Sequence, residues 1–519
     1  MAHFSNFPVH LMATVTSRFS FDSGISTQAF RIIACLTLIR LVYIAFAPVT
    51  GQEVYYWLYA KNPALAYVDH PPMIAYSIYL GTLIFGDNGF GIKFMGVVAS
   101  SLTNLFIYWT VVRAGADSPS DSAEKSGVLA VVIYNLTLFA HAFAIIQQPD
   151  NPLLLFWILV LFFIQEFQLT GKARNLIYAG ISLGLAMLCK YTAVALLPGI
   201  AVALLLTPDG RKCLLTPYPW LAMLAACLVF SPVVYWNWTH DWASFQMQFS
   251  SRGQEITSQR SIQLKYFFQL LGTQLAMLMP LGFVLLARFY FRMVTKWRES
   301  AKAHFYFLSG VFLIVGFLLI SFTSKVKVHW LLPGYLGVIL GIVVVFGPSI
   351  VSGSPWFKRG AWFSAALIGL CHLLFLIPGF QIFQVNSWSG WDKLTDQVVH
   401  MQEQYGGQEK VFIFAESHKT AAYLTFYSED HQRTYAKNIF GEFAKQFTAW
   451  GIPENLNGKN GLFVSRRAEL PEWETSRIGQ YFDNVSRVGV FSYPLISVGN
   501  KPSRDLYVYL ATNYQPKGS

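Results

Sequence analysis

Three carboxylates stand in short polar segments between long apolar stretches of this sequence. Glu53 precedes an aromatic run, Asp69 precedes His70 and two prolines, and Asp150 follows Pro149. An ionised carboxylate beside a hydroxyl can accept its proton as a general base. Ionisable groups at membrane depth are costly unless they are paired or hydrated, so they point to function. We therefore expect these carboxylates to serve acid/base chemistry.

Some of these residues also have a plain structural explanation. Asp150 could cap the N-terminus of a helix, because aspartate accepts hydrogen bonds from the first free N–H groups. Lys190, which interrupts two apolar runs, could extend its amine to the membrane surface. Trp57, Trp236 and Trp238 could anchor the chain at the membrane interface. The sequence leaves these alternatives open.

The composition indicates the kind of protein that must position these groups. Of 519 residues, 54% are hydrophobic and 13% are charged, whereas soluble domains carry roughly 25% charged residues. This excludes a soluble globular enzyme, a disordered chain and a disulfide scaffold. The net charge of +11 arises within 1–384, since 385–519 holds 14 basic and 14 acidic residues. A basic excess in an apolar region indicates inward-facing membrane loops and not nucleic-acid binding.

The long apolar runs predict an α-helical multi-pass membrane protein, since about 20 apolar residues cross a bilayer. We expect eleven spans, at roughly 31–48, 91–112, 127–147, 152–168, 175–189, 191–207, 218–236, 266–288, 304–322, 328–347 and 361–380. The apolar segment 73–85 is short and follows two prolines. Counting it as a span would reverse every later loop and remove the charge bias, so we predict an interfacial helix there.

The distribution of basic residues orients these spans, because inner loops are enriched in lysine and arginine. With 73–85 at the outer surface, the inner loops hold 15 basic residues and the outer loops hold 8. We therefore expect a cytoplasmic N-terminus and an outer, periplasmic location for the polar segments and the C-terminal region. No basic segment followed by a cleavable apolar run begins the sequence, so we expect no signal peptide.

Residues 385–519 are predicted to form a separate extracytoplasmic α/β domain. Strands are expected at 411–415, 461–465 and 506–510, where aromatic and β-branched residues gather. Ser417, followed by an apolar-periodic run to Tyr427, predicts a capped helix.

Several motifs, in this order, resemble those of the membrane glycosyltransferases of family 39. That group is related to the protein O-mannosyltransferases and the aminoarabinose lipid A transferases. The segments that carry the resemblance are Glu53-Val-Tyr-Tyr-Trp57, Tyr67-Val-Asp69-His70-Pro71-Pro72, Phe85-Gly-Asp-Asn-Gly-Phe-Gly91, Pro149-Asp150-Asn-Pro152, Lys190-Tyr191, Trp236-Asn237 through Gln246, and His329-Trp330-Leu-Leu-Pro333. The resemblance implies the GT-C fold, with 1–384 as its transmembrane catalytic domain. Residues 385–519 carry no motif of the family.

The resemblance also implies a substrate class. The donor would be a sugar on undecaprenyl phosphate or another polyprenyl phosphate, and the acceptor lipid A or another envelope glycolipid, with protein as the next choice. The reaction would take place among membrane lipids at the outer face of a bacterial inner membrane. Fixed cations would neutralise the donor phosphate and stabilise the charge that it gains when the sugar leaves. The residues expected to do so are Lys190, Arg252, Arg260, Lys325, Lys327 and His329. Those expected to line the substrate cleft are Gln52, Tyr55, Tyr56, His70, Tyr191, His240 and Trp330.

The first motif departs from the family's usual pattern. The family begins it with Asp-Glu, and the Asp is taken as the main catalytic acid, whereas this chain has Gln52 followed by Glu53. An amide cannot accept the proton. Either Glu53 takes over, or Asp69 and Asp150 carry the chemistry, or the acceptor is already ionised and needs no base.

A divalent metal ion is possible, because His70, His240 and His329 could join Asp69 or Glu53 as ligands, but no spacing demands one. We therefore predict no metal ligands and no certain cofactor.

Two classes of protein compete with a glycosyltransferase. A transporter or flippase would predict inverted repeats and a polar site near the bilayer midplane, whereas the sequence shows no strong repeat and its polar segments lie at span ends. A non-catalytic membrane scaffold would not require the carboxylates and cations together.

Overall fold

The computed structural model describes residues 25–115, 119–248, 262–298, 303–351, 353–382, 388–498 and 502–516. Arg252 and Arg260, both predicted to bind phosphate, lie outside the described residues. Contacts divide the chain into two compact units. The helical unit comprises the described residues of Met1–Tyr43, Phe94–Tyr235 and Ser250–Gly369, and the mixed unit those of Ile44–Lys93, Trp236–Phe249 and Leu370–Ser519.

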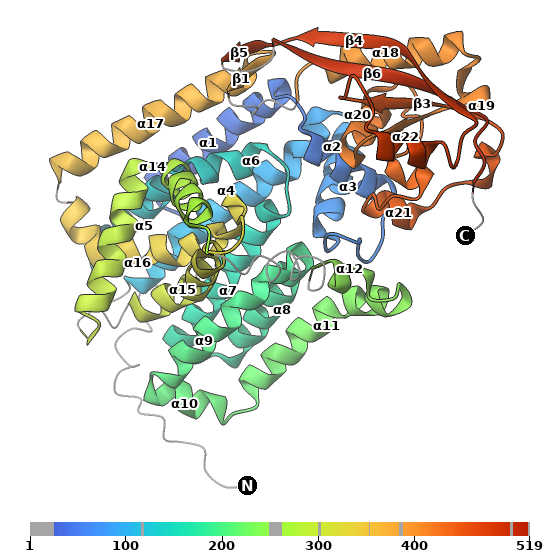
Figure 1. Cartoon of the computed structure of the whole chain (residues 1–519). Helices are drawn as coiled ribbons and strands as arrows, with labels where there is room; N and C mark the ends of the chain where they lie inside the picture. The colour runs from blue at the N-terminus through green and yellow to red at the C-terminus, as the bar shows by residue number, and fades with distance from the viewer. Residues whose placement is uncertain are drawn as a thin grey trace. The chain divides into compact units, whose positions relative to one another are not determined.

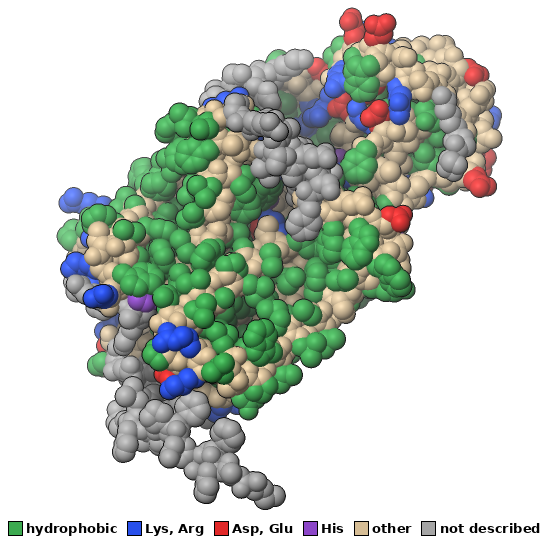
Figure 2. Space-filling model, turned by 60° about the horizontal axis from the view of Figure 1, so that its bottom comes forward, with side chains coloured by type: hydrophobic (Ala, Val, Ile, Leu, Met, Phe, Trp, Pro, Cys, Tyr) green, Lys and Arg blue, Asp and Glu red, His purple; other side chains and the backbone are tan. Residues whose placement is uncertain are grey.

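Apolar helices build the helical unit. Six of the helices that lie wholly or mostly in it are long and apolar enough to cross a membrane: α1 (Thr27–Phe46), α4 (Gly89–Ala114), α7 (Asp150–Thr170), α11 (Tyr218–Thr239), α14 (Leu264–Thr295) and α17 (Pro355–Leu376). Among these, α4 and α7 are the most buried, whereas α1, α11 and α17 expose most of their side chains. Leu228 on α11 and Phe291 on α14 are among the exposed apolar residues. Hydrophobic side chains cover much of one face of the helices in Figure 2, as expected for a surface in contact with lipid.

The remaining predicted spans coincide with bent or shorter helices. Two bent pairs, α5 (Ser120–Asn135) with α6 (Leu138–Ile145) and η2 (Tyr191–Ala195)–α9 (Leu196–Leu205) with α10 (Pro208–Leu214), turn by 73° and 117°. The shorter apolar helices are α8 (Ala173–Cys189), α15 (His304–Ile320) and the first part of α16 (Leu332–Val351). By length and composition the described chain thus supplies six spans, or eight if each bent pair crosses once, against the eleven predicted.

Close packing of α8 on α11 depends on two glycines one turn apart. A Cβ atom on Gly180 would meet the Ala222 carbonyl oxygen at 2.0 Å, and one on Gly184 would meet the Ala226 carbonyl oxygen at 2.7 Å. Small residues spaced four apart allow two helix backbones to approach in a membrane, where apolar burial gives little driving force. The α8 sequence therefore favours a tight pair with α11.

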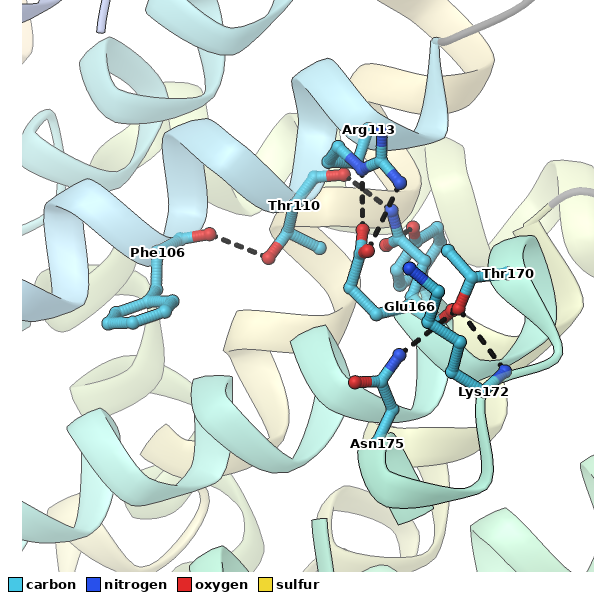
Figure 3. Close-up of polar contacts among 9 residues, drawn as sticks. Phe106, Thr110, Arg113, Glu166, Thr170, Lys172 and Asn175 are labelled. Carbon is cyan, nitrogen blue, oxygen red and sulfur yellow. Dashed lines mark hydrogen bonds and ion pairs between the residues drawn. The ribbon is translucent and has the colours of Figure 1, made fainter. Parts of the chain in front are cut away.

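An ion pair links α4 to α7 near the end of each helix (Figure 3). Arg113 near the end of α4 donates to Glu166 on α7 from Nε at 2.6 Å and from Nη2 at 3.1 Å. Thr170 accepts from Asn175 at 3.2 Å and so ties the start of α8 to the same end. Because α7 rises about 1.5 Å per residue, this cluster lies roughly 24 Å along the helix from Asp150. The polar groups of α7 are thus concentrated near its two ends.

The mixed unit contains a four-stranded sheet in the order β2-β3-β6-β4. Strands β3, β6 and β4 of this sheet are labelled in Figure 1. Strands β2 (Val411–Ala415) and β3 (Asn460–Ser465) are parallel, whereas β6 (Ser503–Thr512) runs antiparallel to both β3 and β4 (Asn484–Pro494). A separate parallel pair joins β1 (Phe380–Ile382) and β5 (Ile496–Val498). The three predicted strands are confirmed as β2, β3 and β6.

Short helices surround the sheet and complete the mixed unit. They are α2 (Gly51–Lys61), α3 (Met73–Phe85), α12 (Ala243–Gln246), α18 (Trp391–Gln404), α19 (Gly407–Lys410), α20 (His418–Tyr427), α21 (Gln446–Trp450) and α22 (Glu472–Ile478). Ser417 caps α20 by accepting from the Thr420 N–H at 3.2 Å, which confirms the predicted capped helix. The aromatic residues of α2 share one core with α18, α20 and the sheet. Residues 51–61 thus pack with the C-terminal part of the chain.

Candidate active site

Glu53 is fully buried in the first turn of α2, where it completes a capping box. Its Oε2 accepts from the Thr50 N–H at 2.8 Å, and Thr50 Oγ1 accepts from the Glu53 N–H at 3.4 Å. Its Oε1 forms an ion pair with Lys93 Nζ at 2.5 Å, and both side chains are 0% exposed. Both carboxylate oxygens are therefore engaged, so a substrate hydroxyl would have to displace one of these contacts.

Asp69 lies in the loop between α2 and α3, and its side chain is also buried. Its Oδ1 accepts from the Tyr59 hydroxyl and, at 3.4 Å, from the Tyr55 hydroxyl. Its Oδ2 lies 3.3 Å from Lys445 Nζ and accepts no hydrogen bond from the described residues. The Lys445 side chain is 29% exposed, so it is in contact with solvent beside the carboxylate. Oδ2 is thus a position where an incoming hydroxyl could donate.

Neighbouring segments fix the loop that carries Asp69. Gln446 accepts from the Val68 N–H at 2.8 Å through its side chain, and its own N–H donates to the Tyr55 hydroxyl at 3.2 Å. The Gln248 side chain donates to the Asp69 carbonyl oxygen at 2.8 Å. The loop is therefore held both by the start of α21 and by the segment after α12.

The charges around Asp69 keep it ionised. Burial by itself raises the pKa of Asp69, but the charges of His70 and Lys445 and the hydrogen bond from Tyr59 outweigh it, so the pKa lies below its ordinary value. Burial first, and then the charge of Asp69, raise the pKa of both Tyr55 and Tyr59 well above the ordinary value. The two tyrosines therefore remain protonated donors to an ionised Asp69 at neutral pH.

Asp150 and Lys190 form a second buried pair, in the helical unit. Asp150 is the first residue of α7, and Lys190 follows the end of α8 with an extended backbone. Lys190 Nζ lies 2.9 Å from Oδ1 and 3.2 Å from Oδ2 of Asp150. A carboxylate at a helix N-terminus is favoured by the helix dipole. The lysine predicted to bind phosphate and the carboxylate predicted to be catalytic thus neutralise each other.

The start of α7 is close to another predicted segment of the helical unit. Asn151 donates to the Phe143 carbonyl oxygen, and the Phe143 ring lies 6.2 Å from the imidazole of His329, centroid to centroid. Lys325 and Lys327 are exposed, whereas His329 and Trp330 are half-buried around the short helix η5 (Val328–Trp330). These three predicted phosphate-binding residues are neighbours in the sequence, and the structure places His329 beside α6.

The remaining predicted cleft residues take different positions. Tyr56 is buried and its hydroxyl contacts His70 Nε2 at 2.8 Å, whereas Gln52 is half-buried next to Glu53 in α2. Tyr191 begins η2, where its ring contacts Phe230. His240 is exposed, and its ring stacks on Trp236 at 4.1 Å. Tyr56 and His70 thus lie at the Asp69 loop.

Sequence reasoning missed the lysines that pair with Glu53 and Asp69. Lys93 stands inside an apolar span, and such a charge indicates a buried partner. Lys445 carries no comparable signal, since it lies in a polar stretch far along the chain. Among the described residues no three His, Cys, Asp or Glu side chains gather in a possible metal site, so we assign no ligands to a divalent ion.

Known proteins share both sequence and fold with this chain. Residues 69–236 match the family described as dolichyl-phosphate-mannose-protein mannosyltransferase. The lipid A galacturonosyltransferase RgtD of Rhizobium johnstonii is 26% identical over 355 residues, which are 66% of this chain and 69% of that protein. The undecaprenyl phosphate-alpha-4-amino-4-deoxy-L-arabinose arabinosyl transferase of Edwardsiella ictaluri is 26% identical over 183 residues, which are 34% of this chain and 32% of that protein.

A solved structure covers nearly the whole chain. ArnT from Cupriavidus metallidurans, in a crystal structure bound to undecaprenyl phosphate, superposes with a TM-score of 0.57 at 14% identity. The superposition covers 93% of this chain and 98% of ArnT. The predicted GT-C fold with a small C-terminal sheet is therefore confirmed, and the chain is a multi-pass membrane protein. The predicted resemblance to membrane glycosyltransferases is confirmed as well.

Proposed function

We propose that this relative of the dolichyl-phosphate-mannose-protein mannosyltransferases transfers a sugar from a polyprenyl-phosphate donor to lipid A or another envelope glycolipid. Undecaprenyl phosphate is the proposed carrier, because it occurs in the names of a sequence relative and of the structural neighbour. Lipid A is the proposed acceptor, because it is in the name of the relative matched over two thirds of its length.

The Asp69 site is the observation that carries this proposal. In the reaction, the acceptor hydroxyl oxygen bonds to the anomeric carbon, while the bond from that carbon to the phosphate oxygen breaks. Polyprenyl phosphate leaves with the bonding electrons, and the hydroxyl proton goes to the base. Asp69 is ionised at neutral pH, and among the described residues its Oδ2 accepts no hydrogen bond and lies beside the partly exposed Lys445. Of the three carboxylates predicted to be catalytic, Asp69 is therefore the one we assign as base.

The other two carboxylates take positioning roles in this proposal. Glu53 holds the start of α2, whose residues Tyr55 and Tyr59 donate to Asp69. Asp150 holds Lys190 in place through both of its oxygens. Each pair satisfies a buried charge that would otherwise be costly.

The donor phosphate is assigned to cations of the helical unit. Lys325 and Lys327 are exposed, and His329 follows them on the same short segment. Lys190, which pairs with Asp150 at the start of α7, stays a prediction for the same role, as do Arg252 and Arg260. Such cations would stabilise the charge that the phosphate gains as the sugar leaves.

We place the reaction at the outer face of the inner membrane, with the N-terminus cytoplasmic and residues 385–519 periplasmic. The excess of basic residues in the predicted inner loops supports this orientation. Arg113 and Glu166 would then close the cytoplasmic end of α7, and Asp150 would begin it at the periplasmic end.

Mass spectrometry of envelope lipids tests the proposal. A deletion strain should lack one sugar on lipid A or on another glycolipid, and the intact gene should restore it, whereas the Asp69→Asn variant should not. Unchanged lipids together with a sugar missing from envelope proteins would instead identify a protein O-glycosyltransferase. Unchanged lipids and proteins would contradict a transferase altogether.

A further inference from the structure

A basic hollow lies in the mixed unit where the two parallel strands end. Its larger part, about 390 Å³, is lined by Glu416, Ser417, Lys437, Arg466 and Arg467. Glu416 and Ser417 follow β2, and Arg466 and Arg467 follow β3. In open sheets, ligands bind in the crevice beyond the carboxyl ends of parallel strands, because loops and helix N-termini meet there. The hollow occupies such a crevice.

A second part of the hollow, about 300 Å³, shares Glu416, Ser417 and Lys437 with the first. Its further lining residues are Met247, His418, Phe443, Ala444 and Lys445. Phe443 is 58% exposed, so this part combines an apolar wall with cations. A ligand with both an anionic group and a less polar body would fit such a wall.

Positive charge exceeds negative charge around the hollow. Arg466 pairs with Glu416 at 2.7 Å, while Arg467 and Lys437 share Glu474 at 2.9 Å and 3.2 Å. Lys445 pairs with Asp69, so four lining cations meet three carboxylates.

Lys419, next to the lining residue His418, adds a fifth cation. Burial first, and then the charges of Lys445 and Arg466, lower the pKa of Lys419. This field of uncompensated positive charge favours an anion. The arginine side chains of the hollow are at least half exposed, with 60% for Arg466 and 50% for Arg467, so both can turn toward a ligand.

Lys445 connects this hollow to the base. Its amine lies 3.3 Å from Asp69 and over the ring of Tyr55 at 5.8 Å, and its side chain lines the hollow. An anion bound in this part of the hollow could therefore contact the same lysine that contacts Asp69, the carboxylate that we assign as base.

We propose that this hollow binds a phosphate group of the acceptor's glycolipid headgroup and so presents the acceptor hydroxyl to Asp69. The inference rests on the proposed function, since it assigns the acceptor side of the same reaction. Arginine is suited to the role because its planar group donates two parallel hydrogen bonds to phosphate. When the phosphate arrives, it attracts Lys445 away from Asp69 and frees Oδ2 for the hydroxyl.

Binding of two acceptors to the purified full-length protein tests this inference without any need for transfer. Wild type should bind phosphorylated lipid A at least tenfold more tightly than the same lipid with its phosphates removed. Arg466→Gln and Arg467→Gln should each weaken binding of the phosphorylated lipid by roughly tenfold, as expected for one charged hydrogen-bonding partner. Arg433→Gln is the matched control, because Arg433 is exposed, contacts two backbone carbonyls and lies outside the hollow.

Kinetics add a second readout. The two arginine variants should raise the apparent acceptor KM by about the same factor and leave the donor KM unchanged. Equal binding of both lipids, or an unchanged acceptor KM in both variants, would overturn the inference while leaving the proposed transfer intact. Inorganic phosphate bound as tightly as the phosphorylated lipid would overturn the assignment to a headgroup. Selective lipid binding without any transfer would support the hollow and contradict the proposed function.

Discussion

The buried ion pair of Glu53 and Lys93 allows a direct test of whether Glu53 positions α2 or acts as the catalytic base. Glu53→Gln removes the charge that neutralises Lys93, whose side chain is 0% exposed. Removing one partner of a buried ion pair costs about 3–5 kcal/mol, because the other charge stays buried and uncompensated. The capping box survives this change, since glutamine can accept at the same position. The stability loss therefore reports the ion pair.

The apparent melting temperature of the purified variants in detergent measures this loss. Glu53→Gln should melt well below wild type, and Glu53→Gln combined with Lys93→Met should recover most of the difference, because a neutral pair needs no compensation. Asp121→Asn is the control, since Asp121 pairs with Lys125 at an exposed position and such pairs contribute about 1 kcal/mol or less.

Transfer assays on the same variants decide the role of Glu53. If Glu53 positions α2, the double variant should regain much of the activity along with its stability. A Glu53→Gln protein that melts like wild type and has lost transfer would refute this reasoning and identify Glu53 as the base. Full stability of the double variant with no activity would point the same way.

Three further predictions concern the helical unit. Asp150→Asn should lower turnover by about 100-fold, because a misplaced Lys190 no longer orients the donor; normal turnover by a well-folded variant would leave Asp150 as a helix cap. Lys325→Ala together with Lys327→Ala should raise the donor KM but not the acceptor KM, and an unchanged donor KM would remove both lysines from the phosphate site. A cysteine placed at Ser122 in a chain without its own cysteines should resist an impermeant thiol reagent in intact spheroplasts, and rapid labelling would reverse the proposed orientation.

The sequence predicts local structure well where one segment carries the whole signal. Ser417 indicates the start of α20, because a side chain that accepts from the first turn needs no distant partner. The strands at 411–415 and 461–465 follow from their buried apolar runs. Hydropathy predicts the apolar helices in the same way. Because some of these helices are bent or short, fewer of them than predicted are long enough to cross a membrane.

The Asp69 site could not be assembled from sequence, because its parts come from distant segments. An interfacial anchor is one interpretation of Trp57 from sequence, yet Trp57 and Tyr55 are both buried in the core that α2 shares with the C-terminal part of the chain. Lys445 and Gln446 contact the Asp69 loop although they are hundreds of residues away in the sequence, and no local sequence pattern identifies them. Such long-range contacts depend on tertiary packing, which cannot be inferred from a single sequence.

Sugar transfer by the purified protein tests the central claim most directly. Undecaprenyl-phosphate sugars and phosphorylated lipid A are mixed with the protein, and the products are followed by mass spectrometry. We predict one sugar added to the lipid for each undecaprenyl phosphate released. The Asp69→Asn variant should transfer the sugar at least about 100-fold more slowly and melt at the same temperature as wild type. Release of undecaprenyl phosphate without a glycosylated lipid would contradict the proposed acceptor, and full activity of Asp69→Asn would contradict the proposed base.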